Sequence, residues 1–193
     1  MTVCENAGTA SCFVAAIGTN VSYQWQVNTG SGWANIATGG VYNIAAGNLS
    51  IANPPATMNG YQYRCFAAGT CVPADTSNAV TLTVNTAPLI ATHPANTNMT
   101  VCAGAGIASC TTVATGTAIA YQWQVNTGSG WTNIATGGVY TITAGNLSIV
   151  NPPATMNGYL YRSFVTGTCT PADTSNTATL TVNTAPVFTV QPT

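Results

Sequence analysis

The chain has 193 residues, of which only 3% are charged: two are Lys or Arg and three are Asp or Glu, giving a formal net charge of −1. An ordinary globular domain carries about 25% charged residues, so Thr, Asn, Ser, Gln and Gly must cover this surface instead. The lack of cationic side chains argues against binding to nucleic-acid phosphates or anionic membrane surfaces. No uninterrupted apolar run approaches the ~20 residues that span a bilayer, so we expect no membrane insertion.

The sequence contains two tandem copies of one unit. Met1–Cys4 returns as Met99–Cys102, and adding 98 to a residue number in the first copy gives its counterpart without a gap. The chain length suits two β-sandwich domains of ~100 residues each. We expect a first domain over residues 1–86, a second over residues 87–185, and a spare strand over residues 186–193.

Short alternating runs separated by Gly, Asn and Pro dominate each copy, and helical periodicity is hard to find, which favours an all-β fold. The central run is 23–33, where Tyr23, Trp25 and Val27 alternate with polar residues before a glycine turn, and it recurs unchanged at 121–131. The strands expected in the first copy are, in order, 1–4, 11–17, 23–28, 33–36, 41–44, 49–51, 61–67 and 80–84, and the second copy repeats each of them.

Residues 89–94 predict a leading strand for the second domain, and the first domain lacks a counterpart. After the second domain, Val187, Phe188, Thr189 and Val190 repeat this strand with no domain left to join. An unpaired, apolar, alternating segment promotes aggregation unless it has a partner. In one interpretation it inserts into domain 1 of the next chain, head to tail, and so makes a fibre. In the other, the chain is a window of a longer array.

The composition offers little for catalysis or metal binding. The single histidine, His93, is replaced by Gln191 in the second copy, so neither domain core has the base that a nucleophile needs. Each copy has at most two acids, so paired carboxylates are missing, and Asp75 or Asp173 alone would make a weak calcium site. No histidine lies near the cysteines to complete a zinc site. We expect no enzymatic activity, no cofactor and no metal.

A few residues suggest roles beyond packing. Arg64 and Asp75 carry the charges common to both copies, and we interpret them as an ion pair or hydrogen-bonded anchor within each domain. Trp33 and Tyr42 form either an aromatic platform for sugars or, in our preferred interpretation, a cover for the sheet edge or the domain junction. The N-glycosylation pattern Asn-x-Ser/Thr, which suggests glycans as partners, occurs at Asn20, Asn48, Asn98 and Asn146.

Cys12 lies 13 residues before Trp25, and Cys65 lies two residues after Tyr63. This pattern resembles the immunoglobulin signature, in which an inter-sheet disulfide packs on a Trp and a Tyr stands two residues before the second Cys. The wider pattern, which includes the run 23–27, is similar to the Ig-like repeats of large bacterial surface proteins and adhesins. The resemblance implies a secreted protein used for extension, adhesion or spacing. It also implies two tandem Ig-like antiparallel β-sandwich domains with core residues Trp25, Tyr63, Trp123 and Tyr161.

The four cysteines of the first copy allow three disulfide connectivities. With the immunoglobulin resemblance in mind, we favour Cys12–Cys65 across the sheets and Cys4–Cys71 between the edge strand and a late loop. The alternative is Cys4–Cys12 with Cys65–Cys71. Seven cysteines in a chain of this kind indicate an oxidising compartment outside the cell.

The second copy tests that scheme because Ser163 replaces Cys65. The favoured pairing then keeps Cys102–Cys169 and leaves Cys110 as a buried free thiol. The alternative pairing leaves Cys169 free in an exposed loop, where a thiol is reactive.

Together these features favour an extracellular structural protein, a subunit or repeat of a filament or pilus-like surface appendage whose partners are copies of itself. The alternative is an adhesin or carbohydrate-binding spacer module of a larger secreted protein. A binding module should carry its distinctive residues in loops that differ between the copies. Here the loops 29–32, 38–40 and 53–60 are identical in both copies, which favours the structural role.

Overall fold

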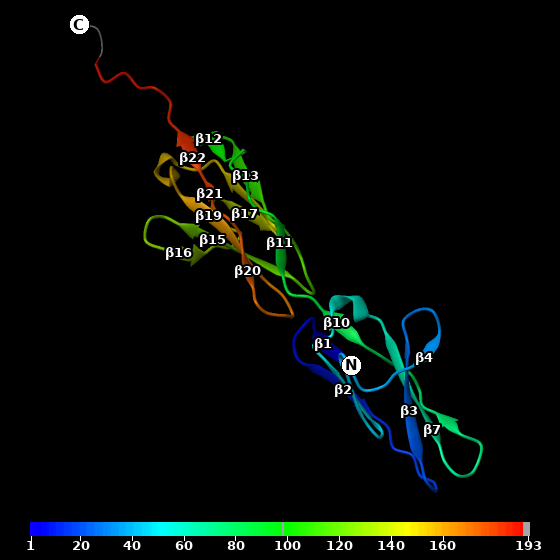
Figure 1. Ribbon diagram of the computed structural model, residues 1–193. Helices are drawn as coiled ribbons and strands as arrows, with labels where there is room; N and C mark the ends of the chain where they lie inside the picture. Colours follow the sequence, from blue (N-terminus) through cyan, green and yellow to red (C-terminus); the bar gives the residue numbers. More distant parts are fainter. Residues whose placement is uncertain (98, 191–193) are drawn as a thin grey trace. The chain divides into compact units, whose positions relative to one another are not determined.

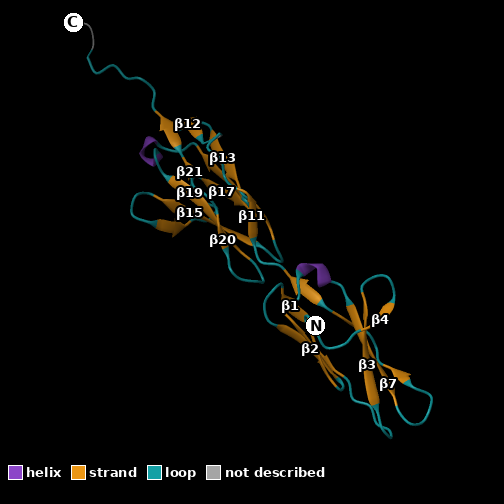
Figure 2. Cartoon of the chain, viewed as in Figure 1, coloured by secondary structure: helices purple, strands orange, loops and turns teal. Residues whose placement is uncertain are grey.

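The computed structural model describes residues 1–97 and 99–190 and contains strands, loops and one short 3-10 helix in each domain (Figures 1 and 2). The chain divides into two compact units, Met1–Thr86 and Ala87–Thr193. Among the described residues, no helix is long and apolar enough to cross a membrane. The elements of domain 1 are β1 (Thr2–Cys4), β2 (Thr9–Phe13), β3 (Ser22–Asn28), β4 (Trp33–Asn35), β5 (Tyr42–Ala45), β6 (Asn48–Ala52), η1 (Ala56–Met58), β7 (Gln62–Ala68), β8 (Asp75–Thr76), β9 (Val80–Thr81) and β10 (Thr83–Asn85).

Domain 2 repeats these elements and adds a leading strand, β11 (Leu89–Thr92), together with its pairing partner β14 (Val113–Thr115). Its elements are β11 (Leu89–Thr92), β12 (Thr100–Cys102), β13 (Ile107–Thr111), β14 (Val113–Thr115), β15 (Ala120–Asn126), β16 (Trp131–Asn133), β17 (Tyr140–Thr143), β18 (Asn146–Val150), η2 (Ala154–Met156), β19 (Leu160–Thr166), β20 (Asp173–Thr174), β21 (Ala178–Thr179) and β22 (Thr181–Asn183).

Each domain is a sandwich of two antiparallel sheets. In domain 1 one sheet has the order β4-β3-β7-β8, with β9 also paired to β7, and the other has the order β2-β6-β5. The run 80–84, expected as one strand, is divided at Leu82: β9 joins β7, whereas β10 pairs in parallel with β1 and places Asn85 opposite Cys4. Domain 2 has the same sheets and, in addition, the antiparallel pair β11–β14.

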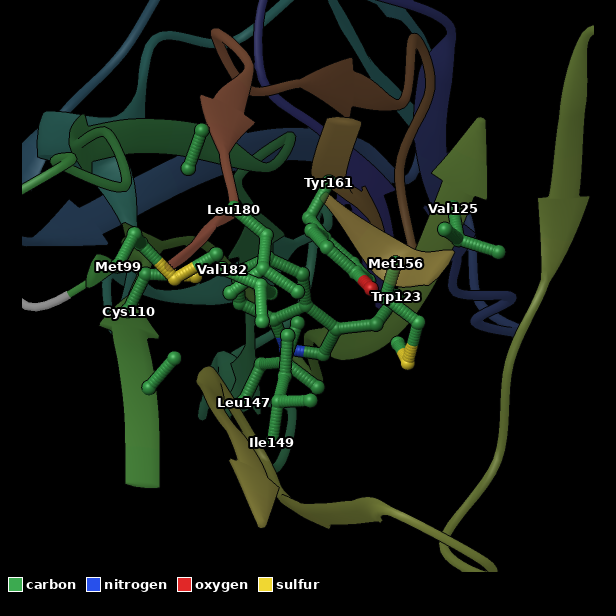
Figure 3. Packing of buried hydrophobic residues seen from close by; sticks show 12 residues of the cluster. Met99, Cys110, Trp123, Val125, Leu147, Ile149, Met156, Tyr161, Leu180 and Val182 are labelled. Atoms are coloured by element: carbon green, nitrogen blue, oxygen red, sulfur yellow. The ribbon is translucent and has the colours of Figure 1, made fainter. Parts of the chain in front are cut away.

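The aromatic residues expected in the core lie there because alternate side chains of a strand point to one face of its sheet. Trp25 is 2% exposed, and Tyr63, Trp123 and Tyr161 are fully buried. Figure 3 shows Trp123 surrounded by side chains from both sheets of domain 2, with Leu147 of β18 facing it. Each domain therefore has its own hydrophobic core.

The cysteines depart from the favoured scheme. Cys4 and Cys169 are disulfide-bonded. The other five are free thiols, so neither Cys4–Cys71 nor Cys102–Cys169 is present: Cys12, Cys65, Cys71, Cys102 and Cys110.

The expected Cys4–Cys71 bond is wrong because these residues lie at opposite ends of the sandwich. Cys4 is opposite Asn85. Asn85 lies beyond Gln62, the first residue of β7. Cys71 follows the other end of β7, after Ala68. A strand of seven residues spans about 20 Å, whereas a disulfide needs Cα atoms within about 7 Å of each other. The same geometry rules out the corresponding bond in domain 2.

Cys12 and Cys65 are neighbours in the core of domain 1, yet the structure holds both as thiols. Burial raises the pKa of each thiol, and the negative charge that Cys65 would carry raises the pKa of Cys12 further. The Cys12–Cys65 bond expected from the immunoglobulin resemblance is not formed in the structure. In domain 2 Cys110 is a buried thiol, and the hydroxyl of Ser163 has no hydrogen-bond partner among the described residues.

Candidate functional site: the open edge of domain 1

The leading strand β11 shows how the edge of one domain is completed. It runs antiparallel to β14, with Leu89 opposite Thr115 and Ile90 opposite Ala114. Ile90 points inward and is 7% exposed, whereas Leu89 points outward and is 64% exposed. The backbone N–H of Ile90 donates a 2.8 Å hydrogen bond to Oδ2 of Asp173. One buried side chain and one charged acceptor thus fix the strand in its register.

Residues on either side of β11 add further contacts. The backbone N–H of Asn176 donates to Nδ1 of His93 over 3.1 Å. Pro88 packs so closely on two glycines that an added Cβ at Gly116 would lie 3.0 Å from its Cα, and one at Gly167 would lie 3.0 Å from its Cγ. Side chains larger than glycine would therefore displace the entry to the strand.

The same edge of domain 1 is open. Among the described residues, no strand pairs with residues 15–17, the counterpart of β14. In place of a strand there is a groove of about 550 Å³, whose lining includes Ala16, Ile17, Ala67 and Asp75. A hollow of about 270 Å³ beside it reaches the core residue Cys65. We refer to both together as the edge groove.

Residues beside the open edge of domain 1 are less buried than their counterparts in domain 2, because no strand covers them in the part of the chain that the structure describes. Val165 is fully buried and Ser175 is 7% exposed in domain 2, where β11 is present. Their counterparts Ala67 and Ser77 are only half-buried in domain 1. Ile17 is fully exposed to solvent. The edge groove is therefore lined mostly by apolar residue types, and nothing lies on it among the described residues.

Asp75 provides a charged side chain to the edge groove. Its Oδ1 accepts a 2.7 Å hydrogen bond from the backbone N–H of Thr76. Asp173 makes the same contact through Oδ1 and uses Oδ2 to hold Ile90. Oδ2 of Asp75 has no such donor among the described residues, so it is available to a backbone N–H.

The ion pair expected between Arg64 and Asp75 is absent from the described residues. Arg64 Nε donates to Oε1 of Gln26 over 2.9 Å, and its guanidinium lies 4.1 Å above the ring of Trp33. The Tyr42 hydroxyl lies 3.3 Å from a core tyrosine hydroxyl. Domain 2 repeats these contacts. The ring face under the guanidinium is therefore not open for stacking on a sugar.

The segment after domain 2 carries exposed apolar side chains. Val187, Phe188 and Val190 are 82%, 83% and 79% exposed, and residues 184–190 form no strand. By the repeat period, Phe188 corresponds to the buried Ile90. Residues 191–193, the last part of the expected spare strand, lie outside the described residues. By the repeat period, this exposed segment corresponds to β11, and the edge groove lies at the place in domain 1 where such a strand would pair.

The candidate glycosylation residues Asn20, Asn48 and Asn146 are exposed, and Asn98 lies outside the described residues. Glycan attachment at these positions stays a prediction.

Comparison with known proteins supports the fold. The three-domain I67–I69 fragment of titin has a TM-score of 0.60 and 14% identity; the match covers 95% of this chain and 62% of the fragment. The eight N-terminal Ig domains of the Down Syndrome Cell Adhesion Molecule give 0.63 and 14%, covering 93% of this chain and 23% of that one. The chain is a pair of tandem immunoglobulin-like domains.

A chain from the complex of Dpr11 IG1 with DIP-gamma gives a TM-score of 0.58 and 16% identity, and the match covers 94% of this chain and 93% of that one. Identities at this level show the fold and nothing more specific. No family model matches the chain, and no curated protein matches it.

Proposed function

We propose that the protein is an extracellular structural protein whose copies join head to tail, with residues 187–190 of one copy inserted into the edge groove of domain 1 in the next. The observation that carries the proposal is the edge groove of domain 1. It lies at the position that corresponds to the one that β11 occupies in domain 2. Strand addition of this kind uses backbone hydrogen bonds for affinity and pockets for specificity.

The register of β11 defines the proposed joint. Phe188 takes the place of Ile90, so it lies opposite Ala16, and its backbone N–H donates to the available Oδ2 of Asp75. Pro186 takes the place of Pro88 and lies on Gly69, the counterpart of Gly167.

The sizes of the side chains support this assignment. Phe188 is larger than Ile90, and the groove wall is correspondingly smaller, with Ala67 where domain 2 has Val165. A larger side chain and a smaller wall conserve volume, which packed interfaces tolerate best.

The proposed joint does not close on itself. One copy offers the strand after domain 2 and the groove in domain 1, so each addition leaves a new strand and a new groove at the ends. The result is a linear polymer. The same joint would also serve between successive repeats of a longer chain.

The chemistry of the surface fits such a role outside the cell. A chain with 3% charged residues has little electrostatic self-repulsion, which favours association between copies. The disulfide-bonded Cys4 and Cys169 suit an oxidising compartment.

Two variants test the proposal, one that keeps only the groove and one that keeps only the strand. The acceptor chain ends at Ala185 and so has no insertable strand. The donor chain carries Ala67→Trp, which fills its own groove. Each is expected to be monomeric alone and to form a one-to-one complex when mixed, as measured by calorimetry and sedimentation.

The matched control is Thr189→Lys in the donor chain, because the counterpart Ala91 is exposed. This variant should bind the acceptor as the parent donor does, whereas Phe188→Asp should abolish binding. If full-length chains form filaments and chains truncated at Ala185 form the same filaments, the proposal is refuted.

A further inference from the structure

Each domain carries one cysteine at either end of its sandwich, and one position of each kind is still a free thiol. Cys102 and Cys71 are both exposed and unbonded. The residues at the same two positions of the repeat, Cys4 and Cys169, are disulfide-bonded. We infer that Cys102 of one copy and Cys71 of the next form a disulfide that locks the strand joint covalently, an inference that rests on the proposed function.

The two end cysteines of one domain are too far apart to bond to each other. The two cysteine positions lie at opposite ends of the strand β7 or β19, about 20 Å apart by strand length. Because a disulfide needs Cα atoms within about 7 Å, neither domain can bond its own pair. Cys71 and Cys102 therefore cannot pair with the cysteine at the other end of their own domain, and both are thiols in the structure.

The proposed strand joint brings the two thiols near each other. Cys102 lies opposite Asn183 in the parallel pair β12–β22. Pro186 follows Asn183 by three residues, which span about 10 Å at most. In the joint Pro186 lies on Gly69 of the next copy, two residues before Cys71. A short stretch of chain thus ties the end that bears one thiol to the loop that bears the other.

The connection between the two domains repeats the order of residues just described for the joint. Cys4 lies opposite Asn85, and Pro88 follows three residues later and packs on Gly167. Gly167 precedes Cys169 by two residues. Both cysteines that flank this connection are disulfide-bonded. The repeat therefore places Cys102 and Cys71 in corresponding positions around the joint between copies.

The bond forms by thiol–disulfide exchange with a low-molecular-weight disulfide such as oxidised glutathione. The thiolate of one cysteine attacks the oxidant and releases one glutathione thiolate, which leaves a mixed disulfide. The thiolate of the other cysteine then attacks the protein sulfur and releases the second glutathione. Two protein thiols become one disulfide, the oxidant becomes two thiols, and no further electron acceptor is needed.

The experiment uses full-length chains assembled in a glutathione redox buffer and separated on a non-reducing denaturing gel. The parent should give a ladder in steps of one chain mass. Cys71→Ser and Cys102→Ser should each give only monomers. Cys110→Ser, which changes a buried thiol, should leave the ladder intact.

Mixing the Cys71→Ser chain with the Cys102→Ser chain should give one covalent heterodimer and nothing larger, with Cys102 of the first bonded to Cys71 of the second in peptide mapping. Filaments that lack any covalent ladder would overturn the inference and leave the proposed function standing. Absence of both filaments and ladder would overturn both. Symmetric Cys71–Cys71 or Cys102–Cys102 dimers would also overturn the inference.

Discussion

The fit of Phe188 to the small wall of the edge groove is the sharpest point at which the proposed joint can be tested. Phe188 is 83% exposed in the isolated chain, whereas its counterpart Ile90 is 7% exposed. Burying a Phe side chain contributes about 1.5–3 kcal/mol. Phe188→Ala in the donor chain should therefore weaken binding to the acceptor about 10- to 100-fold.

A size exchange tests the same contact more specifically. Ala67→Val in the acceptor copies the wall of domain 2, so it should crowd Phe188 and cost about 1–3 kcal/mol. Phe188→Ile in the donor copies the strand of domain 2 and should recover much of that loss. The two changes should therefore couple by about 1 kcal/mol or more in a double-mutant cycle.

Calorimetric titration of the donor variants into the acceptor variants measures each corner of this cycle. Thr189→Ala is the control, because that side chain points outward in the proposed register. If Phe188→Ala weakens binding no more than Thr189→Ala does, Phe188 is not buried in the joint. If the two size changes add to within about 0.5 kcal/mol, the proposed contact between Phe188 and Ala67 is refuted as well, because residues in contact should not behave as independent sites.

Three further predictions concern charge and thiols. Asp75→Ala removes the proposed acceptor of the Phe188 N–H and should weaken the donor–acceptor complex by about tenfold in calorimetry, since hydrogen bonds to charged groups contribute about 1.5–3 kcal/mol; unchanged affinity would contradict the register. Oxidation should join the neighbouring thiols Cys12 and Cys65, and Ser163→Cys should permit the equivalent bond to Cys110; each should raise the free energy of unfolding of its domain by roughly 4 kcal/mol in denaturant titrations, and no gain over the reduced form would contradict it. Burial raises the pKa of Cys110 from 9.0 to about 12, so its thiol stays neutral in the folded state while the unfolded chain ionises. Its contribution to stability should be present below pH 9 and be lost as the pH rises towards 12, so urea titrations should show a smaller loss of stability over this range in Cys110→Ala than in the parent.

Much of the fold was predictable from the sequence because its signals are local. Strand alternation placed Trp25 and Tyr63 on inward faces, and the repeat period assigned the same environment to Trp123 and Tyr161. The leading strand at 89–94 was recognisable for the same reason, and the structure forms it as β11.

Side-chain partners were less accessible to sequence reasoning. Arg64 and Asp75 are the obvious charged pair, yet Arg64 stacks on Trp33 and bonds to Gln26. Gln26 lies directly opposite Arg64 on the neighbouring strand, a register that only the paired sheet defines. Asp75 is instead at the edge, where its counterpart Asp173 receives a backbone N–H from β11.

The sequence by itself determined the class of fold, the two copies and the residues of each core, since periodicity and repetition need no knowledge of distant contacts. Which cysteines can form a bond, and which sheet edge has no strand on it among the described residues, depends on the tertiary structure. The sequence favoured a Cys4–Cys71 bond, whereas the direction of the strands places these two cysteines at opposite ends of one sandwich. Residues 15–17 acquire meaning only when β14 is seen paired with β11 in the other copy. Such facts depend on how strands run and pair across the domain, and chain order does not encode them locally.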